Sequence, residues 1–171
     1  MEEDNRTSPV DIDKIVADYS DMVYQLAYAQ MRNKNDADDI YQEVFLRYIR
    51  KKPVFQNEEH EKAWFVRVTI NCCRNLWSTA FRRHTQPLEY AQTESHSEEA
   101  AVEEGLKELL DRLPKAYRVV IHLFYYEDMS TAQISALLGQ KETTVRVKLT
   151  RARRMLKDLM EGEEEYVEQG V

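Results

Sequence analysis

The stretch TTVRVKLTRARRMLK, Thr143 to Lys157, determines how the rest of the chain is interpreted. On a helical wheel at about 100° per residue, the apolar residues of this stretch, together with one just beyond it, fall within one narrow sector. They are Val145, Leu149, Ala152, Leu156 and Leu159. The opposite side carries Arg146, Val147, Thr150, Arg151 and Arg154. We therefore predict a helix that packs through its apolar side and exposes a basic face.

The preceding segment, STAQISALLG, contains signals for a short helix. Ser130 and Gln133 match a capping box, and Gly139 suits a C-terminal stop. A short helix, a turn containing glycine and a longer helix with a basic outer face form a helix-turn-helix. Its second helix enters the major groove of DNA, where arginine can form two hydrogen bonds to one guanine. The basic face is thus predicted to contact DNA.

Charge is strongly segregated along the 171 residues, although the chain as a whole is acidic, with 24 Lys plus Arg against 31 Asp plus Glu. Residues 62–88 contain five basic residues and no acidic one, whereas residues 89–104 contain six acidic residues and neither Lys nor Arg. Residues 161–171 add five acidic residues. Two basic patches on an acidic body favour two surfaces that face nucleic acid. Ordinary solvated helix faces are the alternative interpretation.

The remaining pattern predicts helices, since only four Gly and four Pro interrupt the chain. One apolar stripe includes Tyr19, Val23, Leu26, Ala27 and Met31. A second includes Ile40, Val44, Phe45, Tyr48 and Ile49, with Asn35 or Asp36 as its cap. A third helix starts at about Glu61, and residues 117–126 form another helix. Trp64, beside Phe65, is expected in the core.

We predict an all-α protein of two small helical domains joined by a flexible acidic linker. The first domain spans residues 10–84, the linker 85–104, the helix-turn-helix domain 105–161 and an acidic tail 162–171. The linker is a simple tether in one interpretation. In the other, its carboxylates compete with DNA phosphates for the two basic faces.

The sequence also argues against several classes of protein. No signal peptide or membrane span is recognisable, which favours a cytoplasmic protein without membrane insertion. Adjacent Cys72 and Cys73 are interpreted as small apolar residues of a helix, and no metal-ligand spacing or cofactor motif is present. No nucleophile, base and orienting partner are grouped, so we do not expect an enzyme.

Three segments resemble one family in register. DADDIYQEVFLRYIR (36–50) and AWFVRVTINCCRNLW (63–77) resemble region 2 of the extracytoplasmic-function (ECF) sigma factors, the small members of the sigma-70 family. The segment from Leu113 to Leu156 resembles their region 4. The resemblance implies a protein that binds core RNA polymerase, directs it to promoters and helps to open the DNA, while the polymerase performs the chemistry.

The resemblance also implies site residues. The residues matching the −35 recognition helix are Thr144, Arg146, Val147, Lys148, Thr150, Arg151 and Arg154. Those expected at the −10 element are Arg67, Asn71, Arg74, Asn75, Arg82 and Arg83. Those matching the polymerase-binding helix are Asp39, Gln42, Glu43, Phe45, Leu46 and Arg47. The implied polymerase contacts are the clamp helices of the largest subunit and the flap of the other large subunit.

Further partners and rival functions follow from the same pattern. Apolar helix faces on tethered domains suit an anti-sigma protein as an additional partner. The free protein is expected to be a monomer. One rival is a two-domain helix-turn-helix regulator that binds a palindrome as a dimer. The other is a helical adaptor that binds no DNA, which would lack a steep dependence on salt.

Overall fold

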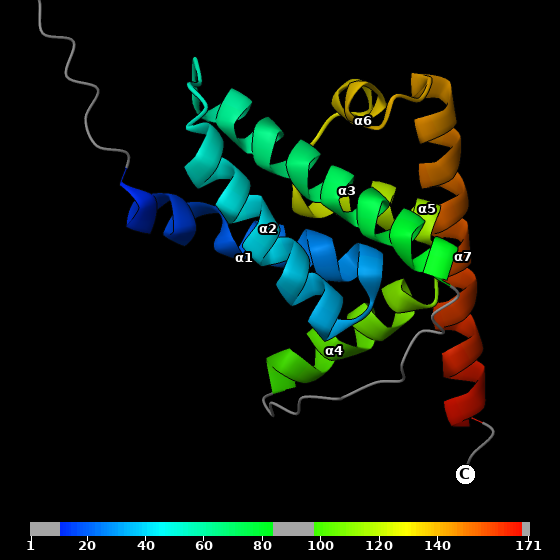
Figure 1. The fold of residues 1–171 in the computed structure, drawn as a ribbon. Helices are drawn as coiled ribbons and strands as arrows, with labels where there is room; N and C mark the ends of the chain where they lie inside the picture. The colour runs from blue at the N-terminus through cyan, green and yellow to red at the C-terminus, as the bar shows by residue number, and fades with distance from the viewer. Residues whose placement is uncertain (1–10, 84–97, 169–171) are drawn as a thin grey trace, which may run out of the picture.

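The computed structural model describes residues 11–83 and 98–168, with side chains placed for residues 11–79 and 105–162. Every regular element in these ranges is a helix, which confirms the predicted all-α class. Figure 1 shows three N-terminal helices on one side, the long C-terminal helix on the other, and shorter helices between and beside them.

The first three helices are α1 (Ile12–Met31), α2 (Lys34–Lys51) and α3 (Glu58–Arg83). α2 is capped by Asn33, whose side chain accepts a hydrogen bond from the backbone N–H of Asp36 at 3.1 Å. The predicted cap, Asn35 or Asp36, is therefore wrong by two or three positions. The turn after α1 is short, so α2 begins at Lys34, directly after Asn33. α3 begins at Glu58, three residues earlier than predicted. The side chain of Asn57, just before it, accepts a hydrogen bond from the backbone N–H of His60.

Aromatic side chains fill the space between these three helices. Phe65 of α3 is fully buried, and its ring centroid lies 4.4 Å from that of Tyr19 and 5.3 Å from that of Tyr48. Phe45 of α2 packs 5.6 Å from Phe65. Trp64 meets Phe65 edge to face at 5.0 Å, so it belongs to this core as predicted. Such ring pairs add to the free energy gained by burying apolar area.

The second half contains α4 (Glu98–Asp111), α5 (Lys115–Ile121), α6 (Thr131–Leu138) and α7 (Glu142–Glu168). α5 continues directly as one π-helical turn, η1 (His122–Tyr126), so the single helix expected over 117–126 changes its hydrogen-bonding pattern midway.

Residues 98–104 are helical although they were predicted as linker, and residues 162–168 are helical although they were predicted as tail. Glutamate is a good helix former, and at the start of α4 its charge is favoured by the helix dipole. The rest of the predicted linker, residues 85–97, lies outside the described residues, as does residue 84.

The two halves pack against each other instead of standing apart. The apolar cluster of the second half includes Leu26 from α1 and Val66 and Ile70 from α3. These side chains meet residues such as Val120 of α5 and Leu149 of α7, all almost fully buried. Figure 1 shows α5 behind α3, between the N-terminal helices and α7. The division into separate domains stays a prediction, while the contact between the halves is a feature of the structure.

Candidate nucleic-acid interface

The helix-turn-helix forms as its local sequence predicts. The Ser130 hydroxyl accepts from the backbone of Gln133 at 3.1 Å, and the Gln133 side chain accepts from the backbone of Ser130 at 2.8 Å, which completes the capping box. α6 ends at Gly139, whose φ of 64° lies in the left-handed region that glycine tolerates best. This sharp turn leads directly into α7.

α7 packs through its apolar sector and exposes its basic face. Val145, Leu149 and Ala152 are buried, as the helical wheel predicts. The exposed members of the −35 set are Thr144, Arg146, Val147, Thr150, Arg151 and Arg154. Figure 1 shows α7 along one side of the molecule.

Two basic members of the −35 set are held by polar contacts. The Arg146 guanidinium donates to a carboxylate oxygen of Glu142 at 2.7 Å, and Glu142 also accepts from the Thr131 hydroxyl at 2.7 Å. The Lys148 ammonium donates to the Gln140 side chain at 2.8 Å and is half-buried. Lys148 is therefore less available to DNA than the other members of the −35 set.

α3 presents a second polar face. Arg67, Asn71, Arg74 and Asn75 are exposed and lie on successive turns of one helix. Since residues three and four positions apart are neighbours on a helix surface, Asn71 lies next to Arg67, Arg74 and Asn75. Arg82 and Arg83 fall in the last turn of α3, where side chains are not described.

α2 presents a face with mixed polar and apolar character. Asp39, Gln42 and Leu46 are exposed, and Leu46 keeps 42% of its surface accessible. The Arg47 guanidinium donates to the Glu43 carboxylate at 2.6 Å, and this hydrogen bond raises the pKa of Arg47.

Phe45 does not belong to this exposed face. Only 8% of Phe45 is accessible, and its ring packs in the aromatic core. Phe45 lies with the other apolar residues of α2 on the side that faces the core. It therefore stabilises the packing of α2 and is not part of the exposed face.

A buried arginine joins the two halves. Arg118 of α5 donates through its guanidinium to the backbone carbonyls of Ala29 and Gln30, at the end of α1. The same group donates to the carbonyl of Leu113 at 3.1 Å and to that of Asp111 at 3.3 Å. These carbonyls lie at the ends of α1 and α4, where helices leave acceptors unsatisfied. Arg118 thus ties the two helix ends together.

An ion-pair cluster lies at another point of the contact between the halves. Lys62 of α3 places its ammonium 3.4 Å from the Glu127 carboxylate and donates to the Glu127 carbonyl at 2.9 Å. Nε2 of His122 lies 3.3 Å from the same carboxylate. Burial raises the pKa of Glu127, but the neighbouring His122 and Lys62 outweigh burial and hold that pKa below its ordinary value.

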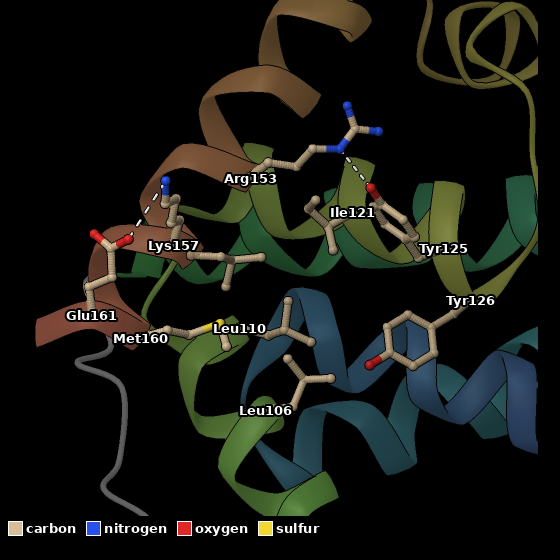
Figure 2. A pocket seen from close by; sticks show the side chains of 10 residues that line it. Leu106, Leu110, Ile121, Tyr125, Tyr126, Arg153, Lys157, Met160 and Glu161 are labelled. Carbon is tan, nitrogen blue, oxygen red and sulfur yellow. Dashed lines mark hydrogen bonds and ion pairs between the residues drawn. The ribbon is translucent and has the colours of Figure 1, made fainter. Parts of the chain in front are cut away.

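An apolar groove of about 580 Å³ opens between α4, η1 and α7. Figure 2 shows Leu106 and Leu110 from α4 facing Tyr125 and Met160 across the hollow. Arg153 of α7 stands at its rim and donates to the Tyr125 hydroxyl at 2.6 Å.

Basic residues surround part of this apolar groove. Lys157 lies at the rim, 3.6 Å from Glu161. The groove therefore suits an apolar segment with acidic residues at its edge.

Sequence analysis missed Arg118, the Lys62–Glu127 pair and the groove. A single arginine inside the apolar run YRVVIHLF was a signal for Arg118, because a buried guanidinium needs several acceptors. The groove had a weaker signal, since Met160 and Leu106 fall at the edges of their apolar stripes. No feature of the sequence indicated the Lys62–Glu127 ion pair.

The remaining acidic, histidine and cysteine side chains in the described part of the chain offer no metal site. No cluster of three His, Cys, Asp or Glu side chains suited to a metal occurs there. Cys72 and Cys73 are buried free thiols, and burial raises the pKa of Cys73 to about 12, so this thiol stays protonated. Over the same residues, no helix combines the length and apolar character needed to cross a membrane.

Comparisons with known proteins agree with this geometry. The family model for sigma-70 region 2 matches residues 15–84, and the model for sigma-70 region 4 matches residues 103–156. The ECF RNA polymerase sigma factor SigE of Mycolicibacterium smegmatis is 31% identical over 157 residues, which cover 86% of this chain and 61% of SigE. RNA polymerase sigma factor SigV of Bacillus subtilis is 26% identical over 143 residues, covering 83% of this chain and 86% of SigV.

Solved structures share the fold. The sigma factor RpoE of Bartonella quintana, in a complex with the anti-sigma factor NepR, has a TM-score of 0.64 at 19% identity, covering 88% of this chain and 97% of that one. CnrH, in a complex with the cytosolic domain of CnrY, has a TM-score of 0.62 at 23% identity, covering 88% of both chains. With both family models matched in order and the helix-turn-helix in place, the chain belongs to the sigma-70 family and is an ECF-type RNA polymerase sigma factor.

Proposed function

We propose that this sigma factor reads the −35 element with the exposed face of α7 and the −10 element with the polar face of α3. The exposure of Arg146 and Arg151 on the first half of α7 carries the proposal. These side chains lie where a recognition helix contacts base edges, and the capped α6 and the turn at Gly139 precede α7 as in a helix-turn-helix. Arg154 lies further along and contacts phosphates.

On α3, Asn71 and Asn75 are the residues we assign to unpaired bases of the −10 element. Each amide side chain offers both donors and an acceptor, so the pair can recognise the edge of a base that has left the stack. Arg67 and Arg74 flank them and suit the phosphates of the same strand. Arg82 and Arg83 extend this basic character to the end of α3.

Core polymerase binds to two surfaces in our proposal. The first is the face of α2 with Asp39, Gln42, Glu43, Leu46 and Arg47, which suits the clamp helices of the largest subunit. Its combination of charged groups and an exposed leucine is typical of a surface for a protein partner. The second surface is the groove between α4, η1 and α7, which we assign to the flap of the other large subunit. Its apolar floor and its basic rim support this choice.

The protein acts without a cofactor and performs no bond-making step of its own, because members of its family recruit the polymerase that does so. It works where polymerase and chromosomal DNA meet, in the cytoplasm. The related folds of RpoE and CnrH occur in complexes with NepR and CnrY, which supports an anti-sigma protein as a further partner of this chain.

Reconstitution with core polymerase tests the proposal directly. The protein should direct core polymerase to a defined set of start sites on genomic DNA, and the transcripts can be sequenced. The matched control is the Arg146→Ala, Arg151→Ala double variant, which should bind core polymerase normally but lose most of these start sites. Start sites that do not depend on the added protein would contradict the proposal.

Gel filtration distinguishes the rival regulator. A sigma factor of 20.3 kDa should elute as a monomer, whereas a regulator that reads a palindrome should elute as a dimer. DNA binding by the holoenzyme should also weaken steeply as salt rises, because phosphate contacts release counterions.

A further inference from the structure

Glu142, the first residue of α7, connects both helices of the helix-turn-helix to one of the proposed −35 residues. One of its carboxylate oxygens, Oε1, accepts a hydrogen bond from the hydroxyl of Thr131, the first residue of α6, at 2.7 Å. The same oxygen accepts from the guanidinium of Arg146, one turn further along α7, also at 2.7 Å. These three side chains therefore form a chain of hydrogen bonds that starts on α6 and ends on the exposed face of α7.

The contact with Glu142 does not withdraw Arg146 from the surface. The Arg146 side chain keeps 63% of its surface accessible, and its guanidinium retains N–H donors that Glu142 does not use. Lys148 on the same helix is different, since its ammonium donates to Gln140 and the residue is half-buried. Glu142 therefore fixes one edge of the Arg146 guanidinium and leaves the rest of the group free for a partner.

Folding stability alone does not account well for this chain of hydrogen bonds. An ion pair between exposed side chains four residues apart adds little to stability, because water screens it. A carboxylate at the start of a helix is favoured by the helix dipole whether or not an arginine lies beside it. What the pair does restrict is the conformation of a long, flexible side chain. Arginine loses rotamer entropy when it binds a base, and a side chain that is already held loses less.

We propose that Glu142 is a positioning residue that orients Arg146 toward a guanine of the −35 element, and that Thr131 in turn fixes the Glu142 carboxylate. This inference rests on the proposed function of α7. Guanine presents O6 and N7 in the major groove, and arginine binds both only when its planar guanidinium is aligned with the base. The hydroxyl on α6 and the carboxylate on α7 restrict this plane before DNA is bound. The base preference at one position then depends on two residues that act through Arg146.

The test compares Glu142→Ala with Glu142→Gln in the holoenzyme, by selecting promoters from a pool with a randomised −35 element. Both variants lose the same negative charge, so any general gain in affinity for phosphates is common to the two. Glutamine keeps a side-chain oxygen that accepts from Thr131 and Arg146, whereas alanine does not. At the position read by Arg146, the preference for the selected base should fall by about fivefold in Glu142→Ala and stay within about twofold of the wild type in Glu142→Gln.

Three further variants show which residue acts through which. Thr131→Val removes only the hydroxyl and leaves the charge of Glu142 in place, so it should lower the preference at the same position by about two- to threefold. Adding Glu142→Ala to Arg146→Ala should cause no further loss of preference there, because the positioned group is already gone. Asp158→Ala removes an exposed carboxylate elsewhere on α7 and is the matched control, which should leave the preference unchanged. The thermal midpoint of each variant is measured beside these preferences.

The outcomes separate this inference from the proposed function. Wild-type preference in Glu142→Ala, or equal loss in the alanine and glutamine variants, would overturn the positioning role while the assignment of α7 stands. So would a further loss in the double variant, since Glu142 would then contact DNA itself, or a lower thermal midpoint with equal weakening on all sequences. Wild-type preference in Thr131→Val would remove Thr131 from the chain. Wild-type preference in Arg146→Ala would instead contradict the proposed function of α7.

Discussion

α3 and α7 carry similar basic faces, but the arginines on these faces have different partners. Both helices pack into the same apolar cluster, α3 through Val66 and Ile70 and α7 through Val145 and Leu149. On α7, Arg146 bonds to Glu142 within its own half, whereas Arg74 of α3 bonds across to α6. The basic face of α7 is exposed, and part of the face of α3 is covered by α6. Charge pattern alone therefore indicates which faces are basic and does not indicate which face another element covers.

This difference depends on the stability of the contact between the two halves of the molecule. The apolar part of their contact gains free energy from buried area, but it is not directional. Hydrogen bonds from Arg118 to the end of α1, and the pair of Lys62 on α3 with Glu127 just after η1, fix the orientation. Changes at these points should open α3 first and leave α7 as it is.

The largest expected effect follows from Arg118→Met. Methionine fills a similar volume but leaves carbonyls at the ends of α1 and α4 without their donor, and each buried unsatisfied group costs about 1–3 kcal/mol. We expect the free energy of unfolding to fall by about 3 kcal/mol or more, measured by urea denaturation followed by circular dichroism. The exposed Arg50→Met is the matched control and should stay within about 0.5 kcal/mol of the wild type. Equal urea midpoints for Arg118→Met and the wild type would show that the interface does not need this residue.

The next effect concerns the open face of α7. Arg146→Ala or Arg151→Ala should each weaken promoter binding by about 1–3 kcal/mol and relax the preference at one or two −35 positions. Arg154→Ala should weaken binding evenly across sequences, since a phosphate contact carries no base information. Selection of promoters from a randomised pool by the holoenzyme measures both the affinity and the base preference of each variant. If the Arg146 and Arg151 variants select the wild-type sequences at wild-type affinity, the assignment of α7 is wrong.

The sequence was most informative where structure is local. The capping box at Ser130, the stop at Gly139 and the apolar sector of α7 depend on neighbours a few residues away, and all three are confirmed. The same holds for the aromatic core, because Tyr19 lies on a predicted apolar stripe and Trp64 was expected in the core beside Phe65. Local spacing therefore predicted most of the helices and the faces that they bury, but not the helical residues 98–104 and 162–168 or the π-helical turn η1.

Contacts between distant segments could not be predicted in this way. Arg118 is held by backbone carbonyls at the end of α1, and backbone groups have no sequence signature. Phe45 is different, because the sequence placed it both in the apolar stripe of α2 and in the polymerase-binding set, and its burial agrees with the stripe. Lys148 has the right charge for DNA, but its bond to Gln140 across the turn is visible only in the fold.

A smaller effect is expected on the third exposed face, that of α2. Gln42→Ala combined with Leu46→Ala removes an amide and an accessible apolar side chain without touching the core, so circular dichroism should stay near wild type. We expect about a tenfold loss of affinity for core polymerase, measured by fluorescence anisotropy of labelled protein. Lys34→Ala, at the exposed start of α2, is the control. Unaltered affinity of the double variant would place the polymerase contact elsewhere.

Asn75→Ala tests the uncovered part of the α3 face. The amide side chain is exposed, so its loss should leave stability unchanged. Loss of its hydrogen bonds to a base should cost about 1 kcal/mol in the opened promoter complex and nothing in the initial closed one. Permanganate footprinting, beside a gel-shift measurement of closed binding, separates the two stages. Normal melting by this variant would remove Asn75 from the −10 site.

The smallest effect at neutral pH concerns Glu127 in the contact between the halves. Burial raises its pKa, yet His122 and Lys62 together hold that pKa below the ordinary value of 4.5. The folded protein therefore binds the proton less well than the unfolded chain does. Its ionised carboxylate contributes stability that is present above about pH 4.5 and is lost as the pH falls through the lower pKa of the folded state.

Urea midpoints measured from pH 6 downward should show this loss. The wild-type midpoint should fall more steeply with acid than that of Glu127→Gln, which has no proton to take up at this position. The variant starts lower at pH 6, because its amide pairs less strongly with Lys62 at the buried site, so the slope and not the absolute midpoint is compared. All other acidic groups are common to the two proteins and cancel in the difference. Parallel slopes would mean that Glu127 does not stabilise the contact through its charge, and the covered state of α3 would then depend on Arg118 and the apolar cluster alone.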